Sequence, residues 1–459
     1  MKPISQTRCV VTLLLGCFAW ASQTTNADER PNVVLIFSDD QGIGDVGCYG
    51  GDIPTPNIDQ IAEQGIRFDR WYSASSICTP SRYGLLTGRN PIRSSDQLLS
   101  ALMFLSPEDQ RRGIEPTAFT LGDLFASHGY ATAAIGKWHL GHGDPSFHPL
   151  RHGFQIFRGH TGGCIDYFTM TYGRTNDWYE NESLVPKNGY ATELMTDEAV
   201  SFIEDRKTRD KPYFLYLAYN APHFGKGWNP PKNETVNIMQ AQAKDLQRVA
   251  FIKDKIRREF AAMVVSLDDG IGRVLDAIDR SSRADDTLVI FLTDHGGDPV
   301  YGGNNGSLRG DKATLFEGGL RVPCLVRWPR RIEAGGQSRR VCSSLDWFPT
   351  FRKLIATTRT SSILDGEMLP ELIGADASPS SPRRLVWQTG RHAELDRGTW
   401  TASLDGDWKY VQDGSGNEYL FDLTTDPNEA QNLSVAYPER LADQRRQTQR
   451  TIEAMRPKP

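Results

Sequence analysis

Four unbroken runs of apolar residues stand out along the chain. They occupy residues 32–37, 131–135, 213–218 and 287–293. A strand that is covered on both faces needs no polar alternation, so such runs are typical of a buried parallel sheet. A shorter apolar run at 324–328 predicts a fifth strand.

Stretches with helical periodicity separate these runs. Residues 57–68 place their apolar side chains on one helical face, with Asn57 as the expected N-cap and Ile66 in the last turn. Further helices are expected at 78–88, 117–128, 191–206, 240–280 with a break near 250–258, and 346–355. The alternation of strands and helices predicts an α/β fold with a large doubly wound, mostly parallel sheet flanked by helices.

Three segments show neither the helical period nor the pattern of a strand, and we expect them to be loops: 90–116, 140–190 and 224–238. The second is rich in Gly, His and Tyr. We interpret it as a long insertion that forms the wall of a pocket.

The composition changes after the last predicted helix of the α/β domain, which we place at 28–355. Residues 356–384 are rich in Thr, Ser and Pro and predict a linker. Residues 385–459 then predict a smaller C-terminal domain, an antiparallel sheet followed by a helix. Its expected elements are strands at 385–389, 398–404, 407–412 and 418–422 and a helix at 437–455.

The N-terminal residues 1–27 have the composition of a secretory signal peptide. Lys2 and Arg8 precede an apolar stretch, and Ala27 ends a suitable cleavage site. We therefore expect a periplasmic or secreted protein. Residues 14–17 also match a bacterial lipobox, which would leave Cys17 lipidated, although the residues that follow are unusually apolar for a lipoprotein tether.

Net charge and hydropathy argue against a nucleic-acid-binding protein and against a membrane-spanning one. The 459 residues carry a net charge of -5, and the isoelectric point is near 6.0. Both argue against a nucleic-acid-binding protein. No segment after the signal is long and apolar enough to span a membrane. Five cysteines follow the signal, and if Cys78 is modified, the other four allow up to two disulfides: Cys48, Cys164, Cys324 and Cys342.

Polar side chains that can bind a metal or take part in catalysis follow four of the predicted strands. They are Asp39, Asp40, Lys137, His139, His223, Asp294 and His295. Ligands in open α/β sheets bind at the carboxyl ends of the strands, so we expect these side chains to share one site. Three carboxylates in one place require a cation, and oxygen ligands suit Ca²⁺ or Mg²⁺. His295 offers nitrogen, which fits such an ion less well.

A cysteine opens the helix expected at 78–88. Pro80 suits the first helical position and Thr79 could cap the helix, which would place Cys78 at its N-terminus. Arg82 lies one turn further on. A thiol beside an Arg and a helix N-terminus has a lowered pKa. A buried structural cysteine is the alternative on position alone.

Two longer motifs bear on this choice. Residues 78–82, Cys-Thr-Pro-Ser-Arg, match the pattern C-x-P-x-R, and the match continues to Gly88. Residues 129–139, Gly-Tyr-Ala-Thr-Ala-Ala-Ile-Gly-Lys-Trp-His, form a second signature. In both the chain resembles the formylglycine-dependent (type I) sulfatases of the alkaline phosphatase superfamily, of the arylsulfatase and N-acetylgalactosamine-6-sulfatase-like kind.

The resemblance implies a role for each of these residues. A formylglycine-generating enzyme would convert Cys78 to formylglycine, and a Ca²⁺ ion (or Mg²⁺) would be the cofactor. The implied metal ligands are Asp39, Asp40, residue 78, Asp294 and His295. Arg82 would hold the formylglycine, Lys137 and Lys312 would bind sulfate, His139 would contact the diol, and His223 would face the leaving oxygen. Lys312 precedes a further family-like stretch, Glu317-Gly318-Gly319.

The expected reaction is sulfate ester hydrolysis. One hydroxyl of the hydrated aldehyde would attack sulfur, the alcohol would leave protonated by His223 or Lys312, and the second hydroxyl would expel sulfate from the sulfated enzyme. A plain Ser or Cys lacks that second hydroxyl.

The expected substrates are sulfated polysaccharides or glycosaminoglycan fragments. Candidate substrate-binding residues in the 140–190 insertion are His160, Asp166, Tyr172, Arg174 and Trp178, with His142 and Tyr167 nearby. Arg391 and His392 could reach the rim. The alternatives are an arylsulfatase or a phosphate or phosphonate monoester hydrolase and, more distantly, a non-catalytic protein that binds sulfated sugars.

Overall fold

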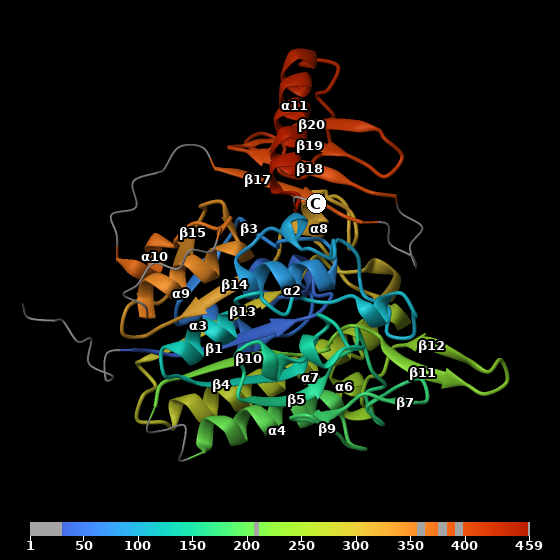
Figure 1. Cartoon of the computed structure of the whole chain (residues 1–459), viewed down its shortest axis with the longest axis vertical. Coiled ribbons are helices and arrows are strands. Elements are labelled where there is room, and N and C mark those ends of the chain that lie inside the picture. Colours follow the sequence, from blue (N-terminus) through green and yellow to red (C-terminus); the bar gives the residue numbers. More distant parts are fainter. Residues whose placement is uncertain (1–29, 206–210, 356–362, 375–382, 391–397, 458–459) are drawn as a thin grey trace, which may run out of the picture.

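The computed structural model describes residues 30–205, 211–355, 363–374, 383–390 and 398–457. A ten-stranded sheet runs through the larger part of the molecule, in the order β15-β2-β14-β13-β1-β10-β4-β5-β8-β9 (Figure 1). Its edge strand β15 comprises Gly336–Ser338. The signal peptide, most of the linker, and Arg391 and His392 lie outside the described residues.

The centre of this sheet is parallel, as the apolar runs predict. It consists of β13 (Thr287–Thr293), β1 (Asn32–Ser38), β10 (Tyr213–Ala218), β4 (Ala131–Lys137) and β5 (Ile156–His160). The fifth apolar run forms β14 (Cys324–Arg327), which is antiparallel to β13. The parallel strands therefore share one carboxyl edge.

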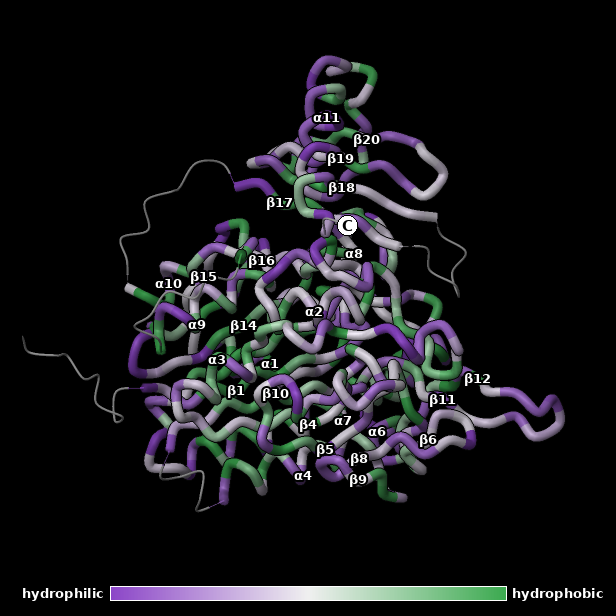
Figure 2. The backbone as a smooth tube through the Cα atoms, viewed as in Figure 1, coloured by the Kyte–Doolittle hydropathy of each residue, from purple (hydrophilic) through white to green (hydrophobic). Residues whose placement is uncertain are grey.

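Successive residues of β1 enter two different hydrophobic cores. Val33, Leu35 and Phe37 pack with α2 (Cys78–Thr87), α3 (Leu121–Ser127) and α9 (Trp347–Ile355). Val34 and Ile36 pack with the helices of the opposite layer: α1 (Pro56–Glu63), α4 (Ala191–Glu204) and α7 (Lys255–Asp279). Figure 2 shows the resulting hydrophobic interior around β1 and its neighbours. The doubly wound α/β architecture is confirmed.

Two predicted elements differ in the structure. The helix predicted at 57–68 ends at Glu63, and Ile66 belongs to β2 (Ile66–Phe68). Thr55, not Asn57, is the N-cap residue, and Pro56 is the first helical residue. The Asn57 side chain instead donates a hydrogen bond to Asp268.

The segment 224–238 is a hairpin and not a loop. Strands β11 (Gly225–Asn229) and β12 (Glu234–Ile238) pair antiparallel and project from the side of the molecule (Figure 1). The 140–190 insertion also contains short strands in addition to β5: β6 (Thr171–Tyr172), β7 (Thr175–Asn176), β8 (Tyr179–Glu180) and β9 (Ser183–Leu184). The break predicted in 240–280 is present, between α6 (Ala243–Arg248) and α7.

The small C-terminal sheet is antiparallel, as predicted. Its strands are β17 (Arg384–Gln388), β18 (Thr401–Asp405), β19 (Trp408–Gln412) and β20 (Glu418–Asp422). Helix α11 (Pro438–Met455) packs on it (Figure 1). Side chains of this sheet form a hydrophobic core with Tyr72, Phe316 and Leu320 of the main part of the chain.

Two further findings concern the described residues. Their five cysteines are all free thiols, so neither of the two disulfides that the count allows is formed. None of their helices is both long enough and apolar enough to cross a membrane.

Candidate active site

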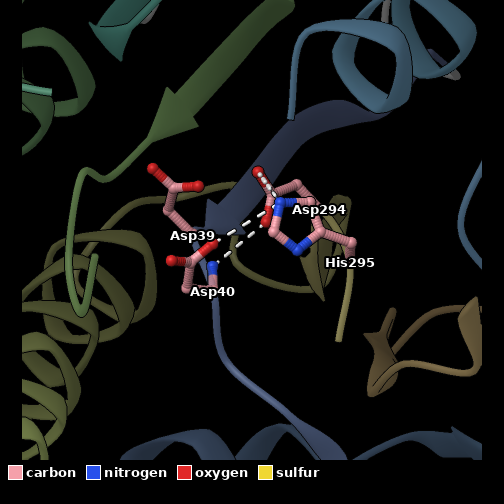
Figure 3. A group of neighbouring side chains, drawn as sticks. All are labelled: Asp39, Asp40, Asp294 and His295. Carbon is pink, nitrogen blue, oxygen red and sulfur yellow. Dashed lines mark hydrogen bonds and ion pairs between the residues drawn. The ribbon is translucent and has the colours of Figure 1, made fainter. Parts of the chain in front are cut away.

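The polar residues that follow the parallel strands come together at one edge of the sheet. Asp39 and Asp40 follow β1, and Asp294 and His295 follow β13. One ligand atom from each of these four buried residues lies within 4.8 Å of the others. Figure 3 shows the imidazole of His295 beside the carboxylates of Asp40 and Asp294.

His295 is oriented so that a lone pair faces the carboxylates. Its Nδ1 atom lies 3.0 Å from the carbonyl oxygen of Gly296, so Nδ1 carries the proton and donates it. In the neutral imidazole, the Nε2 atom then offers a lone pair. It is buried without a hydrogen-bond partner, 3.5 Å from Asp40 and 3.6 Å from Asp294.

The carboxylates of this four-residue cluster repel each other, which shifts their pKa values. Burial and the neighbouring charge of Asp39 raise the pKa of Asp294 well above its ordinary value. Burial would also raise the pKa of Asp39, but the positive charges of Lys137 and Arg82 hold that pKa well below the usual range. Converging carboxylate oxygens and one imidazole lone pair suit a divalent cation.

Three buried cations face the three carboxylates. The Arg82 guanidinium lies 3.4 Å from Asp294 and 3.6 Å from Asp39, and it donates a hydrogen bond of 3.0 Å to the carbonyl of Lys137. Lys137 pairs with Asp39. The Lys312 ammonium lies 2.7 and 2.8 Å from the two oxygens of Asp40. With all six groups ionised their charges cancel, so a divalent cation would make the site positive and suited to an anion.

Cys78 is the first residue of α2, beside this charged group. The N-cap residue is Ile77, without a side-chain cap. The predicted capping by Thr79 is therefore wrong, because its hydroxyl accepts from the backbone N–H of Leu102. Burial would raise the pKa of Cys78, but the positive charges of Lys137 and Lys312 lower it below the ordinary value.

Two histidines flank Cys78 and are neutral. The Nε2 atom of His139 donates to the carbonyl of Leu102 at 2.9 Å, and its Nδ1 is buried without a hydrogen-bond partner. Nδ1 of His223 donates to the carbonyl of Phe224 at 2.9 Å, and its Nε2 lies 3.7 Å from Asp40. Burial lowers the pKa of His139 well below its usual range and that of His223 to about 3.

A small cavity opens beside Cys78. The residues that line it are Cys78, Ala101, Leu102, Met103, Phe104, His139, Gly163, Cys164, Tyr172, His223, Phe224, Lys226 and Lys312. Sequence reasoning missed Phe104, Phe224 and Lys226. They come from segments without a clear period, and no local signal marked them.

The substrate-binding candidates lie in different places. Tyr172 lines the cavity. His160 is buried with Nδ1 donating to Gly162, and Asp166 accepts backbone hydrogen bonds in its own turn. Arg174 lies over the ring of Trp228. Trp178 is fully buried in the second hydrophobic core and does not reach the cavity.

The two further candidates of the insertion have structural contacts. The ring of His142 packs against Phe104 at a centroid distance of 5.0 Å. The hydroxyl of Tyr167 donates to the carbonyl of His223 at 2.8 Å and so supports the loop of that histidine.

Comparison with known proteins agrees with this geometry. The family model described as Sulfatase matches residues 31–356, a segment that contains every strand-end residue of the site. The chain belongs to the sulfatase family. Members of this family are sulfuric ester hydrolases, so the protein is an enzyme that hydrolyses sulfate esters.

Among sulfatases, several relatives are similar over most of the chain. N-acetylgalactosamine-6-sulfatase of Mus musculus is 34% identical over 79% of this chain and 70% of its own length. Arylsulfatase A of Homo sapiens is 31% identical over 90% of this chain and 81% of its own. The crystal structure of Ps i-CgsB has a TM-score of 0.81 and 31% identity, covering 92% of this chain and 93% of that one. A second structure of Ps i-CgsB holds k-i-k-neocarrahexaose.

Proposed function

We propose that this sulfatase removes sulfate from sulfated polysaccharide or glycosaminoglycan sugars. Residue 78, converted to formylglycine, would be the nucleophile and a divalent cation, Ca²⁺ or Mg²⁺, the cofactor. The observation that carries the proposal is the position of Cys78: it begins α2 at the base of the cavity, next to Lys137, Lys312 and His295.

Conversion to formylglycine explains why a cysteine stands there. The hydrated aldehyde supplies one hydroxyl to attack sulfur and a second to release sulfate from the enzyme afterwards. A formylglycine-generating enzyme is the maturation partner that this requires. The N-terminus of α2 directs backbone N–H groups toward the negative charge that develops at residue 78.

Asp39, Asp40, Asp294 and His295 would hold the cation, together with residue 78. The lone pair of His295 and the unpartnered Oδ1 of Asp39 support this assignment, because both are buried polar atoms without a hydrogen-bond partner. When bound, such an ion polarises sulfate and orients the attacking oxygen. Arg82 then balances Asp39 and Asp294 from the opposite side.

Lys137 and Lys312 would bind the sulfate oxygens as point charges, and Lys312 reaches the cavity directly. Burial would lower the pKa of Lys312, but Asp40 outweighs it and raises that pKa. Lys312 therefore keeps a proton that can pass to the leaving oxygen. His223 is neutral and would position that oxygen. His139 would accept the proton of the second hydroxyl through Nδ1, because its Nε2 is already a donor to Leu102.

Two observations support a sugar as the alcohol part of the substrate. One relative is named for an N-acetylgalactosamine sulfate, and Ps i-CgsB binds an oligosaccharide. The cavity walls add the rings of Phe104, Tyr172 and Phe224 and the ammonium of Lys226. Aromatic faces and a cation suit a sugar ring that carries a further anionic group.

Sulfate release tests the proposal. Protein produced with a formylglycine-generating enzyme is given N-acetylgalactosamine 6-sulfate, a sulfated oligosaccharide mixture, 4-nitrophenyl sulfate and 4-nitrophenyl phosphate, each with Ca²⁺ or after chelation. We expect cation-dependent release from the sulfated sugars. Preference for the aryl sulfate would favour an arylsulfatase, and preference for the phosphate ester would overturn the assignment.

A further inference from the structure

A second buried group of charges lies behind the active site, where the C-terminal sheet meets the main part of the chain. Lys409 of β19 lies 2.8 Å from Glu317 and 2.9 Å from Glu429, and all three side chains are fully or almost fully buried. Glu317 belongs to the short helix α8 (Glu317–Leu320), within the stretch Glu317-Gly318-Gly319 that the mechanism does not use.

Hydrogen bonds of Glu317 and Glu429 fix the position of this helix. The hydroxyl of Tyr72 donates to Glu317 at 2.9 Å, and the backbone N–H of Glu317 donates to the Glu429 carboxylate at 2.6 Å. Arg309 donates to the carbonyl of Glu429 and lies over the ring of Phe316 at 4.1 Å. The position of α8 thus depends on residues of the C-terminal domain.

The other side of α8 supports the loop that carries Asp294 and His295. The N–H of Gly296 donates to the carbonyl of Gly319 at 3.1 Å. A Cβ atom at Gly296 would lie only 1.7 Å from the carbonyl oxygen of Gly318, so the two backbones are in direct contact. A displacement of α8 would move the residue that follows His295.

The same helix supports the loop that carries Lys312. The N–H of Gly318 donates to the carbonyl of Arg309 at 2.7 Å, three residues before Lys312. Cβ atoms at Gly318 and Gly319 would lie 2.2 Å from the carbonyls of Gly310 and Thr314. Glycine is therefore required where α8 meets this loop.

We infer that Lys409 is a positioning residue for catalysis: through Glu317 and Glu429 it fixes α8, and α8 fixes the loops of His295 and Lys312. The C-terminal domain thereby completes the active site, although none of its described residues lines the cavity. Buried ion pairs can often be replaced by apolar residues without loss of stability. We therefore explain the buried Lys409 and its two carboxyl partners by the position that they give to α8, and not by a gain in stability. The inference rests on the proposed function, in which these loops hold a cation and sulfate.

The test compares Lys409→Met with a matched control, Arg383→Met. Arg383, which directly precedes β17, also connects the C-terminal part of the chain to the main domain, through the buried carboxylate of Asp346. Among the described residues, no interaction joins Arg383 or Asp346 to α8. Matured enzymes are compared by Ca²⁺ titration calorimetry, by kcat and KM with 4-nitrophenyl sulfate, and by circular dichroism.

For folded Lys409→Met we expect about tenfold weaker Ca²⁺ binding and about tenfold lower kcat, with both quantities within about twofold of wild type in Arg383→Met. If Lys409→Met does not fold, Tyr72→Phe replaces it in the test. This variant removes the hydroxyl that donates to Glu317, and we expect both quantities to change by about threefold in the same direction. Unchanged binding and kcat in the folded variant, or equal changes in the control, overturn the inference. Wild type that binds neither Ca²⁺ nor Mg²⁺ would overturn the proposed cofactor instead.

Discussion

The Nε2 atom of His295 lies 3.5 Å from the Oδ1 atom of Asp40, while its Nδ1 atom lies 3.0 Å from the carbonyl oxygen of Gly296. A lone pair and a carboxylate at this distance repel each other, and the protein buries both. A divalent cation between the two groups removes this repulsion, and we therefore interpret the four-residue cluster as a candidate metal site.

Removing the proposed cation should destabilise the protein. Wild-type protein should melt several degrees lower after chelation, because Asp39, Asp40 and Asp294 then repel each other in a buried site. In Asp294→Asn the melting temperature should no longer respond to Ca²⁺, while the chelated variant should be at least as stable as the chelated wild type. Differential scanning calorimetry checks both. A full Ca²⁺ response in Asp294→Asn would contradict the assignment.

Cys78 and Cys164 both line the cavity, but only Cys78 should matter for catalysis. Cys78→Ala should lower kcat by at least about 10⁴-fold, because the nucleophile is lost. Cys164→Ala should keep kcat within about threefold of wild type. Sulfate release by matured enzymes measures both. Comparable losses in the two variants would mean that the cavity, and not the nucleophile, had been damaged.

Two lysines of the cavity should affect different kinetic constants. Lys312 pairs with Asp40, at the proposed sulfate position, so Lys312→Met should lower kcat by about 10²- to 10³-fold. Lys226 lines the cavity 5.3 Å from the ring of Tyr172, so Lys226→Met should raise KM for a polyanionic oligosaccharide by about tenfold. KM for 4-nitrophenyl sulfate should hardly change in Lys226→Met. A kcat loss in that variant with both substrates would contradict this division.

The Glu429 carboxyl should make stability depend on pH. Burial raises its pKa to about 7, although Lys409 opposes this. Between the ordinary carboxyl pKa, about 4.5, and pH 7 the folded state then holds a proton that the unfolded state has lost, so the free energy of unfolding falls as pH rises, by at most about 1.4 kcal/mol per pH unit.

Glu429→Gln should lack this contribution, whereas Glu453→Gln, at an exposed position of α11, should follow wild type. Urea unfolding at pH 5, 6 and 7 measures the three proteins. Parallel pH dependences in wild type and Glu429→Gln would show that Glu429 is ionised throughout this range.

The sequence predicts the framework of the site well, for a physical reason. Strands such as β1 and β13 are buried on both faces, so their apolar runs are unmistakable, and the residues after them must meet at the carboxyl edge of the sheet. Asp39, Asp40, Asp294 and His295 are found in this way. Lys312 was identified only by resemblance, because nothing in a loop lysine indicates that it points inward.

The walls of the cavity are harder to predict. The β11–β12 hairpin projects from the main sheet, so its residues lack the alternation that marks a half-buried strand. Trp178 and Tyr172 lie in the same Gly-rich insertion, yet one is buried in a core and the other lines the cavity. Long-range packing decides between them. The Lys409–Glu317 pair likewise joins residues 92 positions apart.

The mass of the tryptic peptide 71–82 tests the central claim most directly. Protein made together with a formylglycine-generating enzyme is digested, and the peptide that contains residue 78 is weighed. We predict a mass about 18 Da below that of the cysteine form, because –CH₂SH becomes an aldehyde. An unmodified cysteine in that peptide, from protein that still releases sulfate, would contradict the proposed nucleophile.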